Sequence, residues 1–210
     1  MDERTQSLWE EQSRHGDDRR LLFEAAAQLR PYTKVLYPGS FVDVAASLVF
    51  PDVTYVDSDN EAAAFFGDEA GVAEILGNRA EAATWTFHHG DYTDLALPAG
   101  SFDLVISLYT GIVTDHCSPH LEAGGHLLVN SSHGDAALAS LDPCYRLAAV
   151  ITNRSGTYRL GTDHLDTYLK PKRPTTLTPD VIREQRRGVA YTRKAAAYIF
   201  EKTSPGSAEA

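Results

Sequence analysis

Cysteine is scarce in this chain, and long apolar runs are missing. Its 210 residues include 2 cysteines, Cys117 and Cys144, too few for a framework of disulfides in a chain of this length. Apolar runs such as LAAVI at 147–151 are far shorter than the roughly 20 residues that span a bilayer. The first residues, MDERTQSLWEEQSRHGDD, are charged and contain no apolar stretch of the kind found in secretory signals. These absences predict a cytoplasmic protein without a membrane partner.

Positive charge is also in short supply, and it is unevenly distributed. The chain contains 19 Lys and Arg residues and 29 Asp and Glu residues. The resulting net charge of −10 argues against a nucleic-acid partner. Residues 145–194 nevertheless carry a formal charge of +7, so the remainder carries −17. Two interpretations stay open. The segment is either a basic layer that complements an acidic body or a cap that attracts an anionic small-molecule substrate.

Short apolar runs alternate with helical patterns over most of the chain. Strands are expected at 34–40, 53–59, 84–92, 101–111 and 126–132, and helices at 19–30, 41–50, 60–69, 71–79 and 118–125. This order predicts an α/β fold with a doubly wound, mainly parallel sheet that is Rossmann-like and has helices on both faces. In such a sheet the carboxyl ends of the parallel strands share one edge, which is where ligands bind.

The C-terminal third is less regular. We expect strands at 145–151 and 157–160, a helix at 178–188, and a last strand at 194–203 that is antiparallel and lies at the sheet edge. The predicted organisation is a single domain over residues 1–203, in which 145–194 forms a basic cap or insertion before the last strand. Residues 204–210 are expected to be a frayed tail.

The most informative local pattern is VLYPGSFVD at 35–43. It predicts that a strand leads through Tyr37, Pro38, Gly39 and Ser40 directly into a helix. A glycine lets the backbone turn sharply and approach a ligand, and the free N–H groups at the start of the helix would point toward that ligand. An ordinary strand-to-helix turn is the alternative.

Polar residues follow the next strands at the same edge. Asp57 comes 18 residues after Gly39, a spacing that suits an acid accepting hydrogen bonds from ribose hydroxyls. Ser58 and Asp59 are its neighbours, and Asp59 is either a competitor for that role or the start of the next helix. Further candidates follow the later strands: Asp91 and Tyr92 after the third, and Ser107 and Tyr109 after the fourth.

Five segments, KVLYPGS, VTYVDSD, FHHGDY, FDLVISLYTG and GGHLLVN, resemble the successive strands of the class I S-adenosylmethionine-dependent methyltransferases. The resemblance covers residues 20–135 and the last strand. It implies S-adenosyl-L-methionine as the cofactor, with its methionine part at Tyr37, Gly39 and Ser40. It also implies that Asp57 binds the ribose and that Asp91 contacts the adenine. Residues 107–110 do not match the Asn/Asp-Pro-Pro-Tyr pattern of enzymes that methylate amino groups of nucleic acids, which favours a small-molecule substrate.

Two alternatives remain. One is a non-catalytic Rossmann-like protein that binds a nucleotide or S-adenosylhomocysteine, which is favoured because the turn holds one glycine where that family has two or three. The other is an NAD-dependent oxidoreductase, which shares the order of strand, glycine turn and acid, although the missing glycines count more heavily against it. No catalytic group is assigned, although Tyr109 and His133 are placed to act as a base if the acceptor must lose a proton. His116 and His120 are four residues apart, but Pro119 interrupts the helix that a metal site would need, so no metal is predicted.

Overall fold

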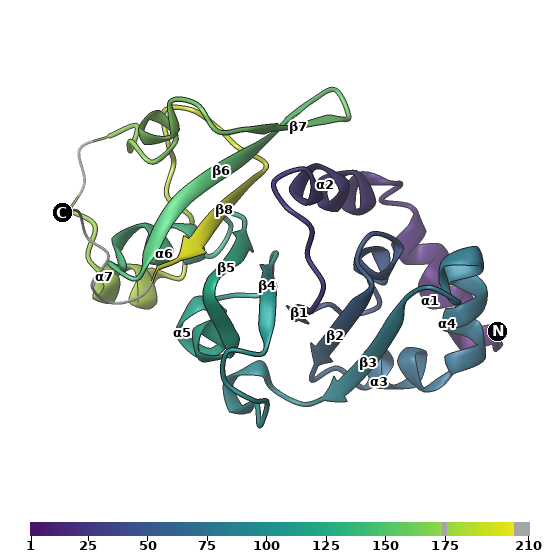
Figure 1. Cartoon of the computed structure of the whole chain (residues 1–210). Helices are drawn as coiled ribbons and strands as arrows, with labels where there is room; N and C mark the ends of the chain where they lie inside the picture. Colours follow the sequence, from purple (N-terminus) through teal and green to yellow (C-terminus); the bar gives the residue numbers. More distant parts are fainter. Residues whose placement is uncertain (174–175, 204–210) are drawn as a thin grey trace.

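The computed structural model describes residues 1–173 and 176–203, and it contains an eight-stranded sheet in the order β3-β2-β1-β4-β5-β8-β6-β7 (Figure 1). The predicted tail at 204–210 lies outside the described residues. The strands are β1 (Val35–Pro38), β2 (Asp52–Asp57), β3 (Thr84–His89), β4 (Phe102–Ser107), β5 (Leu121–Val129), β6 (Tyr145–Arg154), β7 (Thr157–Gly161) and β8 (Ala197–Lys202). The α-helices are α1 (Glu3–Ser13), α2 (Asp18–Ala27), α3 (Asn60–Gly67), α4 (Glu69–Leu76), α5 (Thr114–Cys117), α6 (Asp135–Leu141) and α7 (Pro179–Gln185).

The first five strands form the parallel half of the sheet. β3, β2, β1, β4 and β5 pair in parallel, and the last three strands pair antiparallel. The Rossmann-like α/β prediction is therefore confirmed, although the sheet is mixed. The last strand is antiparallel as expected, but its predicted edge position is wrong. β8 inserts between β5 and β6, and the hairpin partner β7 takes the edge instead.

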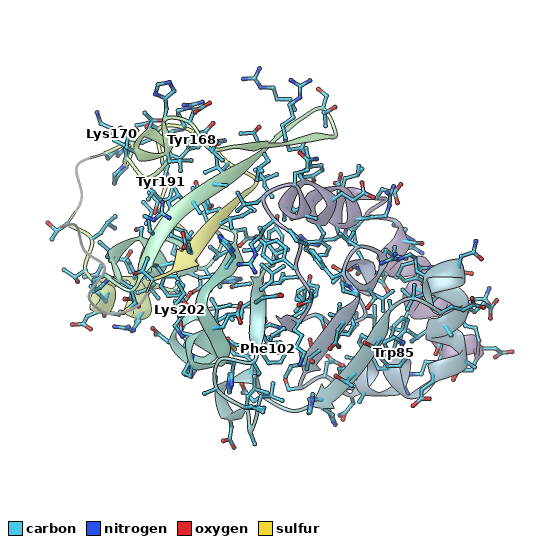
Figure 2. All side chains as sticks on the ribbon, in the orientation of Figure 1. Trp85, Phe102, Tyr168, Lys170, Tyr191 and Lys202 are labelled. Carbon is cyan, nitrogen blue, oxygen red and sulfur yellow. The ribbon has the colours of Figure 1, made fainter. Side chains whose placement is uncertain are left out.

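Helices cover both faces of the sheet. On one face α2, α3 and α4 pack against alternate strand residues such as Tyr37 and Tyr55. On the other face α5 and α6 pack against the intervening residues, such as Leu36 and Val105, and α7 packs against α6. Figure 2 labels Tyr168 and Tyr191, which belong to this second cluster near β6 and β8. Burial on both faces explains why the central strands β1 and β4 read as nearly continuous apolar runs.

The helix predicted at 41–50 does not form. The segment holds only a short 3₁₀ helix at Ala45–Leu48. Asp43 explains this, because its side chain accepts a hydrogen bond from the Ala45 N–H at 3.0 Å and from the Tyr37 hydroxyl at 3.0 Å. A side chain that binds nearby backbone competes with helical hydrogen bonding. The chain therefore leaves the glycine turn without a helix.

The helix end predicted at 118–125 is also wrong. Residues 118–120 form a 3₁₀ turn, and β5 already begins at Leu121. The pairing of β4 with β5 shifts register between Phe102 and Leu104, which marks an irregularity next to Gly124, whose φ is +78°. Gly124 and Gly125 therefore lie at a bulge in β5 and do not terminate a helix. None of the helices in the described ranges is long and apolar enough to cross a membrane.

His126 in β5 predicts a pH dependence of stability. Its side chain is 6% exposed and its ring stacks edge-on against Tyr32 at 5.7 Å. Burial, with a smaller contribution from Arg30, lowers the pKa of His126 from its ordinary value of 6.5. Below pH 6.5 the unfolded chain therefore binds a proton that the folded chain resists, so the free energy of unfolding falls as the pH drops through this window.

Urea denaturation at several pH values between about 5 and 7.5 checks this expectation. The variant His126→Gln should flatten the pH dependence, whereas His88→Gln, which changes an exposed histidine on β3, should leave it unaltered. If the free energy of unfolding changed equally with pH in the wild type and in His126→Gln, the expectation would be contradicted.

Candidate functional site

A cavity of about 610 Å³ lies at the carboxyl edge of the parallel strands. Its walls come from the residues that follow β1, β2, β3, β4 and β5, which is the edge indicated by the sequence. The cavity is lined by Gly39, Asp57, Ser58, Gly90, Asp91, Tyr92, Thr93, Tyr109, Thr110, Gly111, Ile112, His116, His133 and Arg186.

Asp57 connects the ends of β1 and β2. One carboxylate oxygen accepts the backbone N–H of Phe41 at 2.7 Å, and the other accepts the N–H of Asp59 at 2.9 Å. Phe41 has a φ of +49°, which is unusual for a residue with a side chain. Asp57 therefore stabilises the turn after β1. Each carboxylate oxygen has two lone pairs, so the group retains acceptor capacity toward the cavity.

Asp91 and Tyr92 form the wall that follows β3. Asp91 accepts the backbone N–H of Thr93 at 2.9 Å, and this hydrogen bond, with smaller contributions that include His116, lowers the pKa of Asp91. Burial raises the pKa of Tyr92, whose ring lies edge-on to His116 at 6.1 Å. This wall thus offers a charged acceptor beside an aromatic ring.

Thr110 covers the glycine turn. A Cβ at position 39 would lie 1.7 Å from the Thr110 hydroxyl oxygen and 2.3 Å from its Cβ, and Gly39 has a φ of +65°. Glycine is therefore required at position 39 by the approach of Thr110 as well as by the backbone conformation. The N–H of Phe41, which was expected to be free, binds Asp57. Thr110 therefore packs against the side of the turn where a Cβ would project, while Gly39 still lines the cavity.

The loop after β4 is fixed by a buried carboxylate. Asp135 at the start of α6 accepts the Ser107 hydroxyl at 2.6 Å and the backbone N–H groups of Val113 and Thr114 at 3.1 Å. Burial raises the pKa of Asp135. Tyr109 at the tip of this loop has a φ of +62° and is 61% exposed. The loop is thus held at both ends and presents a tyrosine at its apex.

His133 lies against this loop. Its Nε2 is 3.1 Å from the carbonyl oxygen of Tyr109. A carbonyl oxygen only accepts hydrogen bonds, so Nε2 carries the proton and the lone pair lies on Nδ1.

The structure brings seven of the proposed residues into the cavity: Gly39, Asp57, Ser58, Asp91, Tyr92, Tyr109 and His133. The other five lie elsewhere. Tyr37 and Pro38 belong to β1, and the Tyr37 hydroxyl binds Asp43. Ser40 is 3% exposed, and Ser107 is committed to Asp135. Asp59 is the N-cap of α3, where it accepts the Glu61 N–H at 2.6 Å.

Sequence reasoning missed Arg186 and assigned no role to His116. Arg186 is the C-terminal cap of α7 and has a φ of +45°. It lines the cavity although it lies 147 positions after Gly39 in the sequence. From the described part of the basic segment, Arg186 lines this cavity, while other members of the segment form ion pairs elsewhere, such as Arg146 with Glu201. His116 lines the cavity, but His120 is buried beside the carbonyl oxygen of Pro98.

The fold is that of the S-adenosylmethionine-dependent methyltransferases. A methyltransferase of this class from Aquifex aeolicus aligns with a TM-score of 0.50 at 12% identity, over 69% of this chain and 90% of that chain. A protein from Corynebacterium glutamicum aligns with a TM-score of 0.53 at 13% identity, over 97% of this chain and 91% of that chain. These identities establish the fold alone.

This chain spans about half the length of several other structures that it matches. The alignment with the [4+2]-cyclase SpnF, for example, has a TM-score of 0.43 at 18% identity and covers 55% of this chain but 44% of that chain. No protein-family model matches the sequence. No curated protein matches it either.

Proposed function

We propose that this protein is an S-adenosylmethionine-dependent methyltransferase that acts on a small molecule. The observation that supports this most strongly is the position of Asp57 and Asp91 on the wall of one cavity, at the strand edge of a methyltransferase fold. We further propose that residues 1–203 act as a single domain in the cytoplasm.

The residues present fit the nucleoside end of the cofactor. Asp57 offers carboxylate oxygens to ribose hydroxyls, and Asp91 offers one to an exocyclic amine beside the ring of Tyr92. The space for the amino-acid end of the cofactor is narrower, because the side chain of Thr110 packs against Gly39. Thr110 therefore limits the space beside the turn that would hold the amino-acid end of the cofactor.

The sulfonium of the bound cofactor supplies an electrophilic methyl group, so the protein mainly has to align donor and acceptor. Asp57 and Asp91 fix the nucleoside, and Tyr109 marks the border of the cavity toward the acceptor. His133 is the candidate base, since its Nδ1 carries the free lone pair. Tyr109 is a second candidate, because its side chain is exposed at the cavity mouth.

Isothermal titration of the wild-type protein with S-adenosylhomocysteine and with NAD tests the proposal. We expect saturable binding of S-adenosylhomocysteine and binding of NAD at least about tenfold weaker, because the turn after β1 presents neither the three glycines nor the helix N-terminus that hold a pyrophosphate. Preferential binding of NAD would favour the oxidoreductase instead.

A non-catalytic binding protein is the second candidate. The observation that favours it is the contact of Thr110 with Gly39, which restricts the space for the amino-acid end of the cofactor. The part of the cavity beside Asp57 and Asp91 still has space for a nucleoside. Incubation with S-adenosylmethionine carrying a labelled methyl group and a library of small molecules separates the two. Transfer of label supports the enzyme, whereas tight binding without transfer to any compound supports the binding protein.

A further inference from the structure

A second cavity of about 500 Å³ lies on the other side of Tyr109. It is formed by α1, α2, the end of β4 and the hairpin of β6 and β7, which extends over α2 (Figure 1). Its lining residues are Gln12, His15, Asp18, Arg19, Leu22, Leu108, Tyr109, Asn153, Tyr158 and Ala196. Tyr109 lines both cavities, so a ligand in either one contacts the same side chain.

Arg19 is a cation at this second cavity that two neighbouring side chains hold in place. Its Nε lies 3.4 Å from a carboxylate oxygen of Asp43, and its guanidinium carbon lies 4.7 Å from the centre of the Tyr109 ring. The Arg19 side chain is 29% exposed and that of Asp43 only 6%. Asp43 therefore orients Arg19 through Nε, and the Tyr109 ring packs against the guanidinium.

The terminal nitrogens of Arg19 remain available. Among residues 1–173 and 176–203, the only ion pair of Arg19 runs through Nε to Asp43. The guanidinium thus retains the paired N–H groups that bind a carboxylate in a bidentate manner. A side chain oriented in advance loses little freedom on binding, which favours it as a receptor for an anion.

The other lining residues restrict the ligand further. Asp18 faces the same cavity and disfavours a second negative charge, but it accepts a hydrogen bond from a hydroxyl or an amine. Leu22, Leu108 and Ala196 provide apolar contacts, and the rings of Tyr109 and Tyr158 add aromatic surface. A single carboxylate, one donor group and an apolar body are therefore complementary to this lining.

We propose that the second cavity binds a small monocarboxylate with a hydroxyl or amino group, and that Arg19 binds its carboxylate. This second proposal rests on the proposed function in one respect, because it makes the monocarboxylate the methyl acceptor of the enzyme. In that transfer the hydroxyl oxygen or amine nitrogen of the acceptor would form the bond to the methyl carbon as the bond from that carbon to the sulfonium sulfur breaks, S-adenosylhomocysteine would leave, and the acceptor would release its proton to solvent; the two molecules would have to meet at Tyr109, the residue that the two cavities share. The binding itself is measurable independently of methyl transfer.

Ligand-observed NMR titration with two matched pairs of probes tests the proposal. The pairs are 4-hydroxyphenylacetate with 4-hydroxyphenylethanol, and L-phenylalanine with L-phenylalaninol, in which only the carboxylate is replaced. We expect at least one carboxylate to bind about tenfold or more tightly than its alcohol, the factor expected for a charge-assisted hydrogen bond. Arg19→Gln should abolish this preference. Arg20→Gln is the matched control, because Arg20 pairs with Asp17 and Glu24 and does not line the cavity.

Loss of Arg19 leaves the buried Asp43 without its cation and endangers the fold. The double variant Arg19→Gln/Asp43→Asn removes both charges and keeps the test valid if the single variant unfolds. The proposal is overturned if neither carboxylate binds at millimolar concentration, if each binds no better than its alcohol, or if the folded Arg19 variants keep the preference. S-adenosylhomocysteine titrated into the same samples should bind normally, since Arg19 does not line the first cavity. Carboxylate binding without any S-adenosylhomocysteine binding would retain the site and reject the methyltransferase.

Discussion

Replacement of Gly39 by alanine is expected to destabilise the protein by about 2 to 5 kcal/mol. A side chain in the left-handed region, where Gly39 has a φ of +65°, costs roughly 1 to 2 kcal/mol. The new methyl group would also overlap the Thr110 hydroxyl oxygen, 1.7 Å away, and overpacking of this kind costs roughly 1 to 3 kcal/mol. For a chain of this length the melting temperature should fall by roughly 4 to 20 °C.

A double-mutant cycle identifies the cause. Thr110→Gly removes both the hydroxyl and the Cβ that would collide with a methyl group at position 39, so the combined variant should retain only the backbone strain. Thermal and urea denaturation of the four proteins should therefore give a favourable coupling of about 1 kcal/mol or more. Strictly additive effects would show that the contact between Thr110 and the turn does not determine the choice of glycine.

The central strands β1 and β4 were predictable because they are buried on both faces. Segments such as FDLVIS in β4 are apolar nearly throughout, and a sheet covered on both faces explains such a run. The same reasoning placed Asp57 and Asp91 at one edge, since parallel strands bring their carboxyl ends together. The sequence thus predicted the parallel half of the sheet and the acids of the cavity without any knowledge of side-chain contacts, but it did not predict that β8 lies inside the sheet.

The local conformation of the turn after β1 was not predictable in this way. Its helical pattern was overridden by Asp43, which binds backbone, and by Asp57, which binds the N–H of Phe41. Arg186 and the second cavity were missed for a different reason. Both arise where segments distant in the chain meet, α7 with the strand edge and α2 with the hairpin of β6 and β7. Periodicity and spacing carry no information about such meetings.

Asp57→Ala is expected to weaken the binding of S-adenosylhomocysteine at least about tenfold. Hydrogen bonds to a charged acceptor contribute roughly 1.5 to 3 kcal/mol, and about 1.4 kcal/mol corresponds to a factor of ten. The variant should also melt at a lower temperature, because it releases the N–H groups of Phe41 and Asp59. Asp57→Asn keeps one acceptor oxygen, so its losses of affinity and stability should both be smaller.

Asp59→Ala is the matched control for this series. It removes a neighbouring carboxylate that caps α3 and does not line the cavity. Loss of an N-cap costs about 0.5 to 2 kcal/mol of stability, so this variant should be destabilised while its affinity stays unchanged. A comparison of the two alanine variants therefore separates a contact with the ligand from support of the fold.

Isothermal titration of S-adenosylhomocysteine into the wild type and these three folded variants tests the assignment of the first cavity most directly. The predicted result is saturable binding by the wild type and Asp59→Ala, intermediate affinity for Asp57→Asn, and at least about a tenfold loss for Asp57→Ala. Absence of binding by the wild type at millimolar ligand, or undiminished binding by Asp57→Ala, would contradict it.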